Sequence, residues 1–160
     1  MVLASLQTFS ASSLLQSTIE IERYVALASE KGYQAVALTD INVMHGMLDL
    51  KKACEKYEIK PLYGMTLRYP SGESSSETFD IVLLAKNQHG YQNLMRLSSN
   101  IQLSESVSTV YEYMDYFEEM IVLLPPEGSE ISFLVEKGDT KQAQTWLSQL
   151  KKKVPSKDIS

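Results

Sequence analysis

The chain has 160 residues, of which 44% are apolar and 22% are charged, and this composition is ordinary for one globular domain with its own core. With 15 basic against 20 acidic residues and an isoelectric point of about 5.1, the surface on average repels phosphate backbones, which disfavours tight nucleic-acid binding by this segment. There is no apolar run long enough for a membrane-spanning helix and no secretory signal pattern. Cys54 is the only cysteine, so we expect a packed thiol and a cytoplasmic location.

Strand-like and helix-like patterns alternate along the chain, which favours an α/β fold with a largely parallel sheet and crossover helices. In chain order the predicted strands are 3–8, 35–39, 60–66, 79–85 and 120–124, and the predicted helices are 19–31, 46–57, one beginning near Asn87, 111–117, 130–137 and 140–152.

Local signals support several of these boundaries. Gly32 stands where the first helix needs a left-handed residue, and Asp139 or Thr140 can cap the last helix. The polar segment 70–78 is typical of a surface loop between two strands. Residues 154–160 look like the entry to a further strand, so we expect the chain to be a fragment of a longer protein.

Asp40 is the best single candidate for chemistry, because it follows an apolar strand and precedes a loop, where barrel enzymes place ligands and bases. The competing interpretation is a carboxylate that caps the next turn, aided by Asn42. His45 and His89 are the only histidines and lack a metal-binding spacing, so we interpret them as surface or capping residues. The lysine cluster 151–153 closes a predicted helix, where cations favour the dipole.

Three stretches resemble a known family. Residues 37–40 read Ala-Leu-Thr-Asp and residues 60–64 read Lys-Pro-Leu-Tyr-Gly, as in polymerase and histidinol phosphatase (PHP) domains. The run 83–99, with Leu-Leu-Ala-Lys-Asn, Gly-Tyr and Asn-Leu, is similar to the PHP domains at the N-terminus of bacterial DNA polymerase III alpha subunits. The resemblance implies the N-terminal part of a distorted, TIM-like, seven-stranded β/α barrel, with residues 1–160 as a truncated PHP domain.

The metal positions of this family are mostly replaced here. The resemblance puts Gln7 and Phe9 where a His-x-His pair is usual, Ile41 where a histidine follows Thr-Asp, and Thr66 where a glutamate is usual. Only Asp40 keeps a suitable ligand, and isoleucine and phenylalanine have no lone pair for a cation. We therefore expect neither a catalytic nor a metal-binding residue in this segment.

Two kinds of function follow from the resemblance. The first is a structural and interaction module without its own catalysis, belonging to a replicative DNA polymerase whose magnesium and DNA contacts lie elsewhere in the parent chain. Its expected partners are the rest of that chain and replisome proteins such as a proofreading exonuclease, and no membrane. The alternative is an active metal-dependent phosphoesterase or 3′–5′ proofreading exonuclease. A free-standing barrel enzyme that uses unfamiliar residues is a third, weaker interpretation.

Overall fold

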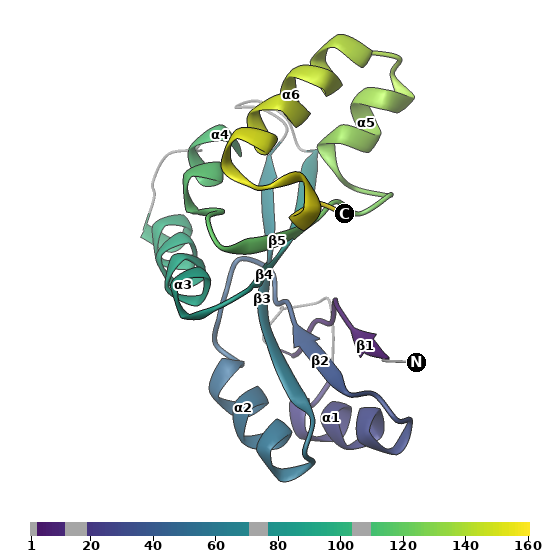
Figure 1. The fold of residues 1–160 in the computed structure, drawn as a ribbon, viewed down its shortest axis with the longest axis vertical. Coiled ribbons are helices and arrows are strands. Elements are labelled where there is room, and N and C mark those ends of the chain that lie inside the picture. Colours follow the sequence, from purple (N-terminus) through teal and green to yellow (C-terminus); the bar gives the residue numbers. More distant parts are fainter. Residues whose placement is uncertain (1–2, 12–18, 71–76, 104–109) are drawn as a thin grey trace.

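The computed structural model describes residues 3–11, 19–70, 77–103 and 110–160 (Figure 1). The strands are β1 (Ala4–Ser5), β2 (Ala35–Leu38), β3 (Lys60–Pro70), β4 (Thr78–Ala85) and β5 (Met120–Leu123). The α-helices are α1 (Ile21–Glu30), α2 (Met47–Lys56), α3 (Gln88–Leu103), α4 (Val110–Tyr113), α5 (Glu130–Glu136) and α6 (Thr140–Lys153). Short 3₁₀ helices cover Met114–Tyr116 and Ser156–Asp158. Within the described ranges, no helix has both the length and the apolar character needed to cross a bilayer.

The five strands form one sheet in the order β1-β2-β3-β4-β5. β1, β2 and β3 are parallel, whereas β4 is antiparallel to both β3 and β5. β4 is therefore the one reversed strand of this sheet, and the prediction of a largely parallel sheet is wrong at this point. The connection from β3 to β4 is too short for a crossover helix, so the chain has to return antiparallel.

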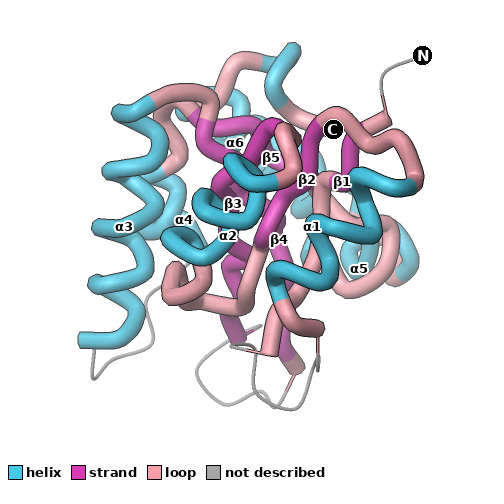
Figure 2. Tube along the Cα trace, turned by 90° about the horizontal axis from the view of Figure 1, so that it is seen from below, coloured by secondary structure: helices cyan, strands magenta, loops and turns pink. Residues whose placement is uncertain are grey.

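Two cores lie on the helix-covered side of the sheet, one in each lobe of the molecule (Figure 1). In the lobe that contains α1 and α2, Val25, Leu50 and Cys54 pack against Val36 and Leu38 of β2. In the other lobe, α3 to α6 cover β3, β4 and β5, and the largest buried residues are Trp146 and Phe117. The long strand β3 runs through both lobes, and Figure 2 shows the strands in the middle with helices around them.

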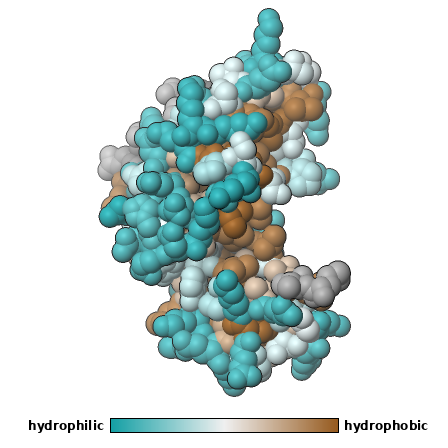
Figure 3. Space-filling view, in the orientation of Figure 1, coloured by the Kyte–Doolittle hydropathy of each residue, from teal (hydrophilic) through white to brown (hydrophobic). Residues whose placement is uncertain are grey.

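The opposite face of the sheet carries a smaller apolar cluster. Ala37, Val82 and Leu84 are buried in it, and Leu62, Ile121 and Leu123 pack beside them. All six residues come from strands, so this face is apolar without a helix in its cluster. Figure 3 shows apolar surface at the narrow middle of the molecule, between the two lobes. The described chain is thus a curled half-barrel with helices outside and an apolar inner face.

A shared carboxylate fastens the last two helices to the sheet. Glu130, the first residue of α5, accepts hydrogen bonds from the Tyr69 hydroxyl and from Trp146 Nε1, both at 3.0 Å. Burial, followed by the negative charge of Glu130, raises the pKa of Tyr69 above its usual value. The phenol consequently stays a donor at every ordinary pH.

Most predicted elements are found within a few residues of their expected bounds. Gly32 has φ of +77°, as the predicted left-handed residue requires, and Asp139 caps α6 through its bond from Gln142 N. The strand predicted over 3–8 is wrong in extent, because only Ala4–Ser5 pairs with β2. The helix predicted over 111–117 begins at Val110 and tightens into a 3₁₀ turn.

The remaining predicted segments differ in smaller ways. β3 continues beyond the predicted 60–66 to Pro70, because its second half pairs with β4. Most of the loop predicted over 70–78 lies outside the described residues. Ile159 forms a parallel bridge with Val122, so the segment predicted as a strand entry does add to the sheet beside β5.

Candidate functional site

The carboxylate of Asp40 lies just beyond the end of β2 and is fully buried. Its Oδ1 accepts a hydrogen bond from the Ser10 backbone N–H at 2.6 Å, and its Oδ2 accepts one from the Ser10 hydroxyl at 2.7 Å. Asp40 therefore holds a residue 30 positions earlier in the chain. Hydrogen bonds to a charged acceptor are among the stronger ones in proteins.

Thr66 is likewise fully buried, and it lies inside β3, where it pairs with Val82 of β4. Its hydroxyl donates to the Thr39 carbonyl at 2.9 Å, and its backbone N–H donates to the Asp40 carbonyl at 3.1 Å. Ile41 forms an isolated parallel bridge with Thr66, in the same register as the β2–β3 ladder. The place where the family has a glutamate is thus occupied by a hydroxyl used within the backbone network.

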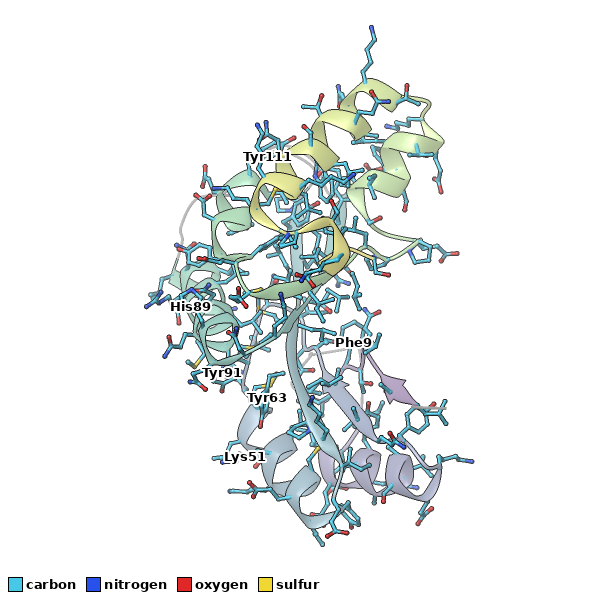
Figure 4. All side chains as sticks on the ribbon, in the orientation of Figure 1. Phe9, Lys51, Tyr63, His89, Tyr91 and Tyr111 are labelled. Carbon is cyan, nitrogen blue, oxygen red and sulfur yellow. The ribbon has the colours of Figure 1, made fainter. Side chains whose placement is uncertain are left out.

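A third set of bonds joins the segment after β1 to the end of β2. Thr8 N donates to Thr39 Oγ1 at 3.0 Å, and Thr39 N donates to the Thr8 carbonyl at 2.8 Å. The Thr8 hydroxyl also donates to the hydroxyl of Tyr24 on α1, at 2.9 Å. Gln7 and Phe9 flank Thr8, Gln7 being exposed and Phe9 partly buried. Figure 4 places Phe9 in the middle of the molecule, between the lobes.

The structure therefore joins three of the five candidate positions, Asp40, Ile41 and Thr66, where the end of β2 lies beside the middle of β3. Gln7 and Phe9 lie on the adjoining segment, connected through Thr8. These side chains do not fit a catalytic metal centre, because zinc needs three or four protein ligands and only Asp40 carries a carboxylate. In the described ranges, no group of three or more His, Cys, Asp or Glu residues is placed to hold a metal ion.

Asn42 does not support Asp40 as predicted but turns toward β3. Asn42 has a positive φ of 56°, which asparagine tolerates better than most residues. Its side chain pairs with the Arg68 backbone, accepting from the N–H at 2.8 Å and donating to the carbonyl at 2.9 Å. Arg68 in turn binds both carboxylate oxygens of Asp80 at 2.7 Å, and this hydrogen bonding raises the pKa of the guanidinium. The Asn42 side chain therefore binds the backbone of β3 and not the Asp40 carboxylate.

The remaining polar candidates lie on the surface. His45 is exposed, and the His89 ring is 51% exposed with its Nε2 3.5 Å from Glu118 Oε2. Asn87 caps α3 by accepting from His89 N and Gly90 N, so the predicted helix start is correct. At the end of α6, Lys153 pairs with Asp115 at 2.6 Å. Two exposed imidazoles beside helix starts agree with their interpretation as surface residues.

Cys54 lies in the core on the inner side of α2, with 1% of its surface exposed. Burial raises the pKa of the thiol to about 11, so the reactive thiolate is scarce at neutral pH. The prediction of a packed thiol is confirmed.

Ser10 and Thr8 hold the candidate positions together, although neither was among the predicted site residues. Their contribution comes from contacts about 30 residues away, Ser10 with Asp40 and Thr8 with Thr39. A serine or threonine after a short strand carries no signal of its own. The alternation Thr8, Phe9, Ser10 places both hydroxyls on one side of an extended segment, which is the one hint that was available.

Comparison with known proteins identifies the class. The family model for the PHP domain matches residues 5–160, so the chain belongs to the PHP domain family. It is also similar, at 16% identity and a TM-score of 0.45, to a solved amidohydrolase from Chromobacterium violaceum, covering 91% of this chain and 54% of that one. That likeness is too weak to bear on function.

Similar proteins give more specific information than the family model. The chain is 37% identical over 139 residues to the DNA polymerase III subunit alpha of Bacillus subtilis (strain 168), covering 86% of this chain and 12% of that protein. It is 34% identical over 140 residues to the protein of the same name from Staphylococcus aureus (strain COL), covering 87% of this chain and 13% of that protein. The chain is therefore homologous to a segment of these subunits and spans about an eighth of their length.

Proposed function

We propose that this chain is the PHP domain of a replicative DNA polymerase III alpha subunit, and that it acts as a metal-free structural and interaction module. In this proposal the parent protein is the DNA-directed DNA polymerase, and residues 1–160 contribute no catalytic group. The magnesium ions that support nucleotidyl transfer and the contacts with DNA belong to other parts of that parent chain. The setting is the cytoplasm.

The observation that carries the proposal is the hydrogen bonding of Asp40, the one acid among the five candidate positions. Asp40 is fully buried, and both of its oxygens accept hydrogen bonds from Ser10. A cation at this point would have to share a carboxylate already used to position a loop, with Ile41 and Thr66 as neighbours. Neither neighbour brings a negative charge, so the charge of a divalent cation would stay largely uncompensated.

The same hydrogen bonds support a role as a brace. They join the segment after β1, the end of β2 and β3 through buried contacts between distant parts of the chain. Such contacts make the half-barrel a firm support for whatever packs on it. Its partners would then be the rest of the polymerase chain and replisome proteins such as a proofreading exonuclease.

Metal analysis tests the proposal directly. The chain is purified without chelator, its zinc, manganese and iron contents are measured, and its melting temperature is recorded with EDTA, Mn²⁺ or Zn²⁺. We expect substoichiometric metal and the same melting temperature in each condition, because a ligand that binds only the folded state raises the melting temperature. Two or three metal ions per chain, with hydrolysis of a phosphodiester substrate, would replace this proposal by the active phosphoesterase or exonuclease.

A further inference from the structure

A groove lies between α2 and α3, at the end of β3 opposite to Asp40. It encloses about 480 Å³, and its walls come from α2, the start of β3 and the start of α3. Figure 4 shows Tyr63 and Tyr91 close together in it and Lys51 on the neighbouring helix. The groove is separate from the strand ends that carry the candidate metal positions.

Two tyrosines form an aromatic floor within the groove. The rings of Tyr63 and Tyr91 meet edge to face, with centroids 5.3 Å apart. Such aromatic pairs prefer this geometry, so they form a fixed floor. Leu48 stands beside them with 61% of its surface exposed, although most large apolar residues of the chain are buried. A rigid aromatic floor next to an exposed leucine can bury an apolar side chain of a partner.

The rim of the groove is basic. Lys51, Lys60 and Lys86 line it, and none of its described lining residues is acidic. Lys60 forms no ion pair with a described carboxylate, and Lys51 reaches only Glu55, at 3.8 Å on the open surface. Lys86 is the one rim lysine with a close partner, at 2.8 Å from Asp158. In a chain of net charge −5, such a group of lysines is a local exception.

We propose that this groove binds a short acidic peptide segment of a partner protein. An apolar side chain of the segment would lie between Leu48 and the tyrosine pair, and flanking carboxylates would approach Lys51 and Lys60. This inference rests on the proposed interaction role and supplies the chemistry of one partner. A peptide fits better than a nucleic acid, because the tyrosines present an edge-to-face pair instead of parallel stacking planes and the chain as a whole repels phosphates.

The test uses the ¹⁵N-labelled 160-residue chain and the hexapeptide acetyl-Asp-Glu-Leu-Phe-Asp-Glu-amide in an NMR titration. We expect saturable shifts of amides at Leu48, Tyr63 and Tyr91, and no such shifts with a control peptide whose four acids are replaced by lysine. Absence of groove shifts with the acidic peptide would overturn the proposal. A short oligothymidine that shifts the same amides at lower concentration would overturn it in favour of single-stranded nucleic acid.

Matched variants locate the binding. The double variant Lys51→Glu with Lys60→Glu reverses two exposed rim charges and should weaken the peptide about tenfold, since rim charges act mainly through complementarity. The control, Lys141→Glu with Lys152→Glu, reverses two exposed lysines of α6, away from the groove, and should bind as the wild type does. Equal affinities for both variants would contradict the assignment.

The outcomes separate this inference from the proposed function. Failure of the peptide to bind would remove the groove assignment but leave metal content and thermal response unchanged. Stoichiometric metal would remove the metal-free role and leave any peptide binding at the far end of β3 intact. Leu48→Ser adds a check on the apolar contact, because it alters an exposed side chain and should weaken binding without lowering the melting temperature.

Discussion

Removal of the Asp40 carboxylate is the perturbation that distinguishes a structural from a metal-binding role most clearly. Asp40→Ala leaves the Ser10 N–H and hydroxyl without the acceptors they have at 2.6 and 2.7 Å. Asp40→Asn keeps the shape, because its amide oxygen can still accept from the N–H and its NH₂ can donate to the serine oxygen. The two substitutions should therefore differ in their effect on stability.

The magnitude follows from the number of bonds and their burial. A hydrogen bond to a charged group is worth about 1.5–3 kcal/mol, and a donor left unsatisfied in the interior loses a similar amount. Since Asp40 is fully buried and accepts two bonds from Ser10, Asp40→Ala should lower the free energy of unfolding by about 3–5 kcal/mol. Asp40→Asn should lower it by only about 1–2 kcal/mol, because both contacts keep a neutral partner.

The assay is urea unfolding followed by the fluorescence of Trp146, the only tryptophan, which is buried in the core. A double-mutant cycle of Ser10→Ala with Asp40→Ala should give a coupling of about 1.5–3 kcal/mol, independent of added EDTA or Mn²⁺. Ser99→Ala removes an exposed hydroxyl bonded within α3 and serves as the control with little effect. A coupling below about 0.5 kcal/mol, or a loss that appears only when metal is present, would refute the reasoning.

Three further predictions concern the core. Burial raises the pKa of the Cys54 thiol to about 11, so the thiol of the unfolded chain ionises first as pH rises. Between about pH 8 and pH 10.5, the free energy of unfolding of the wild type should therefore fall by about 2 kcal/mol more than that of Cys54→Ala, as measured in parallel urea titrations. Glu130→Ala should lower the free energy of unfolding by about 2–4 kcal/mol, because the Tyr69 hydroxyl and Trp146 Nε1 lose their shared acceptor. Glu130→Gln should lower the same quantity by less than half as much, because its amide oxygen can still accept. Gly90→Ala should cost about 3 kcal/mol or more, since its Cβ would overlap the backbone carbonyl oxygen of Glu119, and a melting temperature within about 2 °C of wild type would contradict this.

The helices and their ends were predictable because their signals are local. Apolar residues at helical spacing marked α1, α2 and α6, and single residues such as Gly32 and Asn87 specified where a helix ends or begins. The direction of β4 was harder, since alternation along the chain suggests parallel strands and only the short connection from Pro70 to Thr78 shows that the strand returns. The extent of β1 could not be predicted, because pairing with β2 depends on contacts across the fold.

The candidate site was likewise predictable from the sequence only in part. The family positions were found from the residues that flank them, since Thr39 and Asp40 follow a strand that can be recognised by its apolar run. What Asp40 does was not predictable, because its partner Ser10 belongs to a segment with no distinctive pattern. The expected link between Asp40 and Asn42 was wrong because the Asn42 side chain has a better partner in the free backbone edge of Arg68.

Under the proposed metal-free role, these contacts would be what keeps β1, β2 and β3 together in place of a metal centre. A metal centre cross-links the strands that supply its ligands, so loss of the ligands would release those strands unless other bonds replaced them. Here the Ser10–Asp40 and Thr8–Thr39 contacts join the first segment to β2, and the Thr66 hydroxyl joins β3 to the Thr39 carbonyl. Each bond is made inside the protein and spans distant parts of the chain, so it adds stability that is independent of metal supply. If the proposed metal-free role is correct, Asp40 acts within this hydrogen-bond network, and a chelator should leave the stability of the chain unchanged.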